Sequence, residues 1–115
     1  MKNFLKNLKT LLKITQTGKN NFGLTDSDVK VLKNIFEKYG ARNVYIFGSR
    51  ARGDYKRYSD IDLFVKDKIP KAQKAKLSLE LQESSIPYTI DLVFFDELQS
   101  DKLKQEVDYE GILFN

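Results

Sequence analysis

Apolar and polar positions along the chain follow two different periods, one typical of helices and one of strands. Apolar side chains recur every three or four positions over residues 25–39. This run starts with Thr25 and Asp28, which have the spacing of a capping box. Gly40 follows it, as glycine commonly does at the C-terminal end of a helix. The pattern therefore predicts an amphipathic helix that ends at Gly40.

Shorter runs rich in β-branched and aromatic residues predict strands. The expected elements are a helix at 25–39, strands at 43–47 and 59–65, a helix at 70–85, a strand at 88–95, a helix at 96–110 and a short terminal strand at 111–114. The strand at 88–95 is apolar at most positions on both faces, which predicts a central place in the sheet. Helices that alternate with strands predict an α/β (α+β) fold, a small mixed sheet with helices packed on it.

The first residues of the chain form a separate amphipathic pattern. Phe4, Leu5, Leu8, Leu11 and Leu12 recur at helical spacing, and lysines occupy the opposite face. We expect a helix over residues 3–14 that packs on the domain or on a partner, although a basic amphipathic helix can also lie on a membrane surface. The chain is thus divided into a basic extension, residues 1–22, and a domain, residues 23–115.

Charge is distributed unevenly between these two parts. The chain has 115 residues and a formal net charge of +4, with 20 basic and 16 acidic residues. Five lysines and no acidic residue lie in residues 1–25, which leaves 15 basic and 16 acidic residues for the remainder. A nearly neutral domain argues against direct action on nucleic acid. There is no apolar stretch of the roughly 20 residues that a membrane span needs, and no secretory signal pattern, so we expect a cytoplasmic protein.

The absence of two residue types limits the kinds of catalytic and metal site that this chain can form. There are no cysteines and no histidines, which excludes disulfides, thiolate zinc sites, cysteine nucleophiles and histidine-dependent triads. Catalysis by this chain must use carboxylates, hydroxyls, lysine or arginine. The cofactor class that suits carboxylate oxygens is a hard divalent cation, Mg²⁺ or alternatively Mn²⁺.

Two strands carry aspartates in positions that fit such a cation. Asp60 and Asp62 flank one apolar residue, so they share one face of the strand at 59–65. Asp91 lies within the apolar strand at 88–95. If the two strands are neighbours, the three carboxylates converge, and their mutual repulsion requires a positive partner. Three carboxylates without histidine are what a two-metal phosphoryl- or nucleotidyl-transfer site requires.

The turn before these aspartates carries candidate phosphate ligands. Gly48 and Ser49 end the strand at 43–47, and glycine lets backbone N–H groups approach a phosphate. All four arginines lie within residues 42–57, and Arg50 and Arg52 are the candidates for nucleotide contact. One of these two could contact the nucleotide while the other forms an ion pair with Asp54.

The segment "GSRARG…SDIDL", with the later "IDLV", resembles the nucleotidyltransferase domains of the DNA polymerase β superfamily. The signature of that superfamily is G-S, about ten residues, then D-x-D, and here ten residues separate Gly48-Ser49 from Asp60-Ile61-Asp62. The short chain resembles the minimal nucleotidyltransferases, including antitoxins of the MntA type. The resemblance implies a polymerase β-like core in which Asp60, Asp62 and Asp91 bind two Mg²⁺ ions. It also implies that Asp91 helps to deprotonate the attacking hydroxyl and that Gly48 and Ser49 contact the phosphates of a nucleoside triphosphate.

The same resemblance implies a partner. Minimal nucleotidyltransferases commonly act as antitoxins beside a HEPN-type ribonuclease toxin, in type VII-like systems, by transferring AMP from ATP to a tyrosine of the toxin. Two alternatives stay open from the residues alone. One is transfer to a small acceptor, such as an aminoglycoside, and the other is a non-catalytic antitoxin that neutralises its partner by binding. Neither the acceptor nor the oligomeric state, which could be a homo-oligomer, is marked in the sequence.

Overall fold

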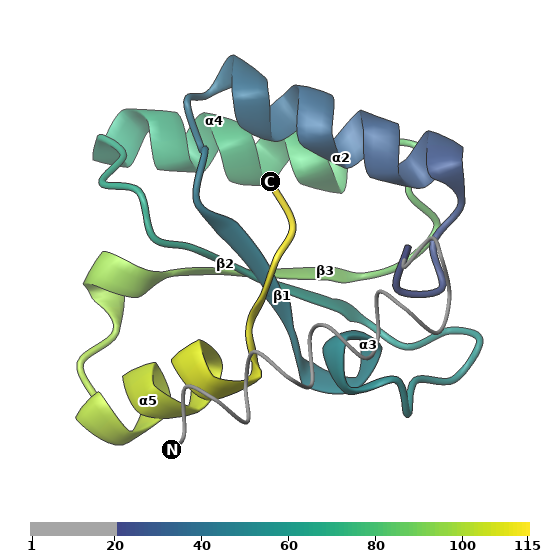
Figure 1. Ribbon diagram of the computed structural model, residues 1–115. Coiled ribbons are helices and arrows are strands. Elements are labelled where there is room, and N and C mark those ends of the chain that lie inside the picture. Colours follow the sequence, from purple (N-terminus) through teal and green to yellow (C-terminus); the bar gives the residue numbers. More distant parts are fainter. Residues whose placement is uncertain (1–20) are drawn as a thin grey trace.

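The computed structural model describes residues 21–115 (Figure 1). The helix expected at residues 3–14 lies outside this range. The elements are α2 (Asp26–Lys38), β1 (Val44–Phe47), α3 (Gly48–Arg52), β2 (Ile61–Val65), α4 (Lys71–Gln82), β3 (Ile90–Phe94), a 3-10 turn η1 (Phe95–Glu97), α5 (Asp101–Glu110) and β4 (Ile112–Leu113). No helix among these residues has the length and apolar character that a membrane span needs.

In the described part of the chain, four strands form one mixed sheet in the order β3-β2-β1-β4. β1 is antiparallel to both β2 and β4, whereas β2 and β3 are parallel. Parallel neighbours require a crossover connection, and α4 provides it. The small mixed sheet with packed helices that the sequence predicts is confirmed.

The expected central place of β3 is wrong, because β3 lies at one edge of the sheet. Phe94 is its one buried residue, and Asp91 is exposed. The apolar side chains of β3 are covered only in part, by α4 and by the neighbouring strand, so apolar composition alone did not indicate its position.

The sheet lies between two layers of helices. α2 and α4 cover one face, whereas α3 and α5 lie on the other (Figure 1). Ile61, Leu63 and Val65 of β2 alternate along the strand and are completely buried. On the other face, the ring of Phe64 stacks on Tyr45 with 5.1 Å between their centroids. This alternation leaves Asp62 on the same face as Phe64, the face that α5 only partly covers.

The helix ends follow the local sequence signals with one exception. The capping box of Thr25 and Asp28 is formed, and Gly40 has a φ of +74° just after α2. The single helix expected over 96–110 is wrong, because the chain forms η1 and then restarts with Ser100 as the N-cap of α5. The Ser100 hydroxyl accepts a hydrogen bond from the amide of Leu103, at 3.2 Å.

The first described residues already belong to the core. Phe22 and Leu24 are buried, and the ring of Phe22 lies 6.2 Å from that of Phe114 near the C-terminus. The turn that precedes α2 is therefore fixed against the end of the chain.

Candidate active site

The turn at Gly48 is built around Asp62. Phe47 at the end of β1 pairs with Asp62 of β2 in the antiparallel register. Gly48 has a φ of +72°, and a Cβ at this position would lie 2.3 Å from Oδ2 of Asp62. Glycine is thus required both by the backbone conformation and by the space that the carboxylate occupies.

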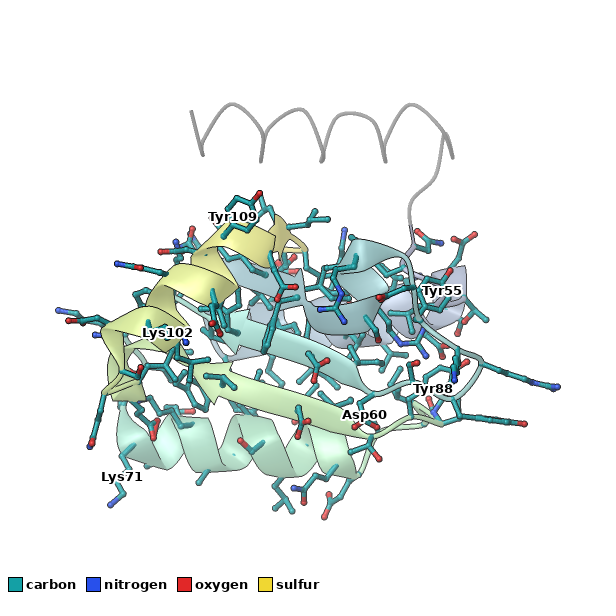
Figure 2. All side chains as sticks on the ribbon, turned by 90° about the horizontal axis from the view of Figure 1, so that it is seen from below. Tyr55, Asp60, Lys71, Tyr88, Lys102 and Tyr109 are labelled. Atoms are coloured by element: carbon teal, nitrogen blue, oxygen red, sulfur yellow. The ribbon has the colours of Figure 1, made fainter. Side chains whose placement is uncertain are left out.

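Asp62 and Asp91 are direct partners across the parallel pair of β2 and β3. Partners in register point to the same face of a sheet, so the two carboxylates lie on the face that carries Phe64. Asp60 precedes β2 and is exposed; it lies at the same end of the sheet as Tyr88 (Figure 2). The condition on which the expected convergence depended, that these two strands are neighbours, is met.

The electrostatics of Asp62 reflect this crowding. Burial, the largest cause, and the carboxylates of Asp91 and Asp60 together raise the pKa of Asp62 from 3.8 to about 6. The guanidinium of Arg52 acts in the opposite direction and lowers the pKa of Asp62. Negative charge at this point of the sheet is therefore disfavoured unless a cation accompanies it.

The donor set fits a hard divalent cation by its chemistry. Carboxylate oxygens are the ligands that Mg²⁺ and Mn²⁺ take, and a bound cation would reverse the repulsion that raises the pKa of Asp62. Within residues 21–115, no three acidic side chains are gathered closely enough to hold an ion between them. The carboxylates of Asp91 and Asp60 repel that of Asp62 when no cation is present.

Arg52 lies beside the aspartates and is held by two carboxylates. Its Nη1 lies 2.8 Å from Oε1 of Glu110, and its Nε lies 3.3 Å from Oδ2 of Asp54. From the sequence, either Arg50 or Arg52 could form an ion pair with Asp54. In the structure, Arg52 forms it. Glu110 comes from α5, 58 residues away, and its contact with Arg52 has no signal in the sequence.

Arg50 is placed very differently. Its side chain is buried, with 2% of its surface exposed, and its guanidinium donates to the backbone carbonyls of Phe22 and Ser59. The donors that the sequence assigned to nucleotide phosphates are thus directed at the protein's own backbone. Ser49, the residue before it, is half-buried at the start of α3.

Comparison with known proteins places this geometry in a family. Residues 30–115 match the model of the family described as Polymerase beta, Nucleotidyltransferase. The chain belongs to this family. It is a nucleotidyltransferase, as the spacing of the G-S and D-x-D residues implies.

Relatives of this nucleotidyltransferase include a curated protein and several solved structures. The present chain is 35% identical to the protein adenylyltransferase MntA of Thermococcus cleftensis. The match extends over 69 residues, which are 59% of this chain and 70% of that protein. A structure of a putative minimal nucleotidyltransferase is 28% identical, with a TM-score of 0.61 over 75% of this chain and 88% of that one. A crystal structure of a toxin-antitoxin with AMP-PNP shares the fold, with a TM-score of 0.61 and 24% identity over 76% of this chain and 72% of that one.

Proposed function

We propose that this nucleotidyltransferase transfers AMP from ATP to a tyrosine hydroxyl of a HEPN-type toxin and so acts as its antitoxin. The observation that carries the proposal is the pairing of Asp62 with Asp91 beside Gly48, since it gathers the carboxylates next to the turn expected to bind phosphate. The similarity to a protein named as an adenylyltransferase supports the choice of AMP and of a protein acceptor. The toxin-antitoxin structure that shares the fold supports the choice of a toxin as that acceptor.

The aspartates have distinct roles in this proposal. Asp60, Asp62 and Asp91 would hold two Mg²⁺ ions, whose positive charge would stabilise the negative charge that develops during transfer. Asp91 is exposed on an edge strand, where an acceptor can reach it, and it takes the proton of the attacking hydroxyl. The hydroxyl oxygen bonds to the α-phosphorus of ATP, the bond to the β-phosphate oxygen breaks, and pyrophosphate leaves with that electron pair.

The turn and one arginine orient the triphosphate. Gly48 presents backbone without a side chain next to Asp62, and Ser49 follows it at the start of α3. Arg52 is exposed beside the aspartates and already engages carboxylate oxygens, whose geometry resembles that of phosphate oxygens. Arg52, rather than Arg50, is therefore the phosphate-binding arginine of this proposal.

Transfer of a radioactive α-phosphate tests the proposal. The protein is incubated with α-labelled ATP, Mg²⁺ and a lysate of its host, beside the variant Asp62→Asn and the control Asp101→Asn, which removes an exposed carboxylate in the first turn of α5. We expect label on one small protein, lost with Asp62→Asn and kept with Asp101→Asn. Label in a small molecule alone would indicate a small acceptor, and capture of a partner without any transfer would indicate a binding antitoxin.

A further inference from the structure

Arg50 is a buried cation that forms no ion pair with an acidic residue among residues 21–115. Its Nε and Nη2 donate to the carbonyl oxygen of Ser59, at 3.1 and 2.9 Å, and its Nη1 donates to that of Phe22, at 2.9 Å. No carboxylate in the described part of the chain forms an ion pair with it. Burying a charge is costly unless its donors are satisfied, and here backbone carbonyls satisfy them. A lysine could not reach both carbonyls with the same fixed fork of donors.

Two tyrosines enclose the guanidinium. Its central carbon lies 4.5 Å from the ring centroid of Tyr88 and 5.2 Å from that of Tyr55. Tyr88 precedes β3 and Tyr55 belongs to the loop that leads to Asp60, and both lie at the Asp60 end of the sheet (Figure 2). Cation–π contacts of this kind strengthen when water is excluded.

The backbone before α2 is bent to reach Arg50. Phe22 has a φ of +56°, which is rare for a bulky residue, and Gly23 follows with a φ of +76°. A Cβ at Gly23 would lie 2.3 Å from the ring of Tyr55 and 2.9 Å from Nη1 of Arg50. Strained conformations of this kind persist where the surrounding contacts require them, and here they deliver the Phe22 carbonyl to Arg50.

Asp60 lies between two fixed peptide groups. On its N-terminal side, the Ser59 carbonyl is held by two N–H groups of Arg50. On its C-terminal side, the amide of Ile61 donates to the carbonyl of Thr89, at 2.9 Å. Since Asp60 itself precedes β2, these two anchors determine the direction in which its side chain leaves the backbone.

We infer that Arg50 is a positioning residue, which holds the Ser59–Asp60 peptide so that Asp60 joins Asp62 and Asp91 as a metal ligand. The inference rests on the proposed function, because it takes the three aspartates as the metal site. It assigns to Arg50 a role other than phosphate binding: the Arg50 side chain connects Phe22, Ser59 and Tyr88, which lie in three separate segments of the chain.

Metal affinity tests this role directly. Binding of Mn²⁺ is measured by the electron paramagnetic resonance of the free ion, without nucleotide, which would itself bind Mn²⁺, for the wild type, Arg50→Gln and Arg50→Lys. We expect Arg50→Gln to weaken Mn²⁺ binding about tenfold, the size typical of a lost supporting contact behind a metal ligand. Arg50→Lys keeps the charge and one bond, so we expect an intermediate loss of about threefold.

A control variant separates positioning from stability. Leu77→Val shortens a buried side chain of α4, under the opposite face of the sheet, and should lower the unfolding temperature while changing Mn²⁺ affinity by less than twofold.

If Arg50→Gln lowers the unfolding temperature but binds Mn²⁺ as the wild type does, the inference is wrong. If Arg50→Gln does not fold, Arg50→Lys decides the question by the same comparison. Failure of the wild type to bind Mn²⁺ would overturn the proposed function and the inference together, whereas wild-type binding with unchanged variants overturns the inference alone.

Discussion

Asp62 and Asp91 stand opposite each other on adjacent parallel strands, and this arrangement places two carboxylates side by side on one face of the sheet. The pKa of Asp62 rises to about 6 as a result of burial and of its acidic neighbours. The unfolded chain has no such crowding, so the folded protein holds this proton more tightly than the unfolded chain does. In the absence of metal, the arrangement therefore opposes folding at neutral pH.

The first prediction concerns the pH dependence of metal-free stability. Because the folded pKa of Asp62, about 6, lies above its ordinary value of 3.8, the free energy of unfolding should fall as pH rises between these two values. Asp62→Asn removes this loss and should be more stable than the wild type by about 1 kcal/mol at about pH 7.5, a figure reduced for partial solvent exposure. Urea unfolding at about pH 4 and pH 7.5 measures the difference. An equal stability difference at both pH values would contradict the prediction.

Binding of a metal ion should offset the destabilisation that ionised Asp62 causes in the metal-free protein. A cation that binds the folded protein alone stabilises it, and at ten times its Kd the gain is about 1.4 kcal/mol. We expect Mg²⁺ to raise the unfolding temperature of the wild type at about pH 7.5 and to have much less effect at about pH 5, where Asp62 retains its proton. A chelator should abolish the rise in unfolding temperature, and Mg²⁺ should raise the unfolding temperature of Asp62→Asn only slightly. An equal rise in the unfolding temperature of Asp62→Asn would show that the stabilising Mg²⁺ binds away from Asp62.

The features that the sequence predicts are those that short stretches of chain determine. The capping box at Thr25 and the strand boundaries near Val44 and Ile61 both depend on local pattern. The restart of α5 was also detectable, because Ser100 is a favourable N-cap just before a helical run. The continuous apolar and polar pattern over 96–110 concealed it.

The features that the sequence did not predict depend on contacts between distant segments. The edge position of β3 is set by which strands pair, and its own composition does not specify this. Arg50 and Arg52 are two residues apart on α3, yet one is buried against backbone carbonyls and the other is exposed beside Glu110. Nothing in "SRAR" distinguishes them, because the difference arises from Phe22 and from α5.

Gly48→Ala should impair both folding and transfer. The residue has a φ of +72°, and the added Cβ would lie 2.3 Å from Oδ2 of Asp62, so the carboxylate must move. We expect a loss of about 2 kcal/mol in stability, from backbone strain plus the displaced carboxylate, and a loss of transfer of at least 100-fold. Gly40→Ala is the matched control, because Gly40 has a φ of +74° but no atom within 4 Å of its Cβ position. It should lose about 1 kcal/mol from strain and retain transfer.

Arg52 and Glu110 provide the last prediction, on nucleotide binding. If Arg52 binds phosphate, Arg52→Gln should weaken the binding of a non-hydrolysable ATP analogue about tenfold, which corresponds to about 1.4 kcal/mol. Glu110→Gln removes the carboxylate 2.8 Å from Nη1 and frees the guanidinium to rotate, so its loss should be smaller, about threefold. Both side chains are at least partly exposed, so neither change should alter stability by more than about 1 kcal/mol. Calorimetric titration of the analogue with each variant measures both effects. Lys38→Gln is the control, because it breaks an ion pair with Glu80 between α2 and α4, on the opposite face of the sheet (Figure 1). Wild-type affinity in Arg52→Gln would remove Arg52 from the phosphate site and leave the turn at Gly48 and Ser49 as its remaining protein component.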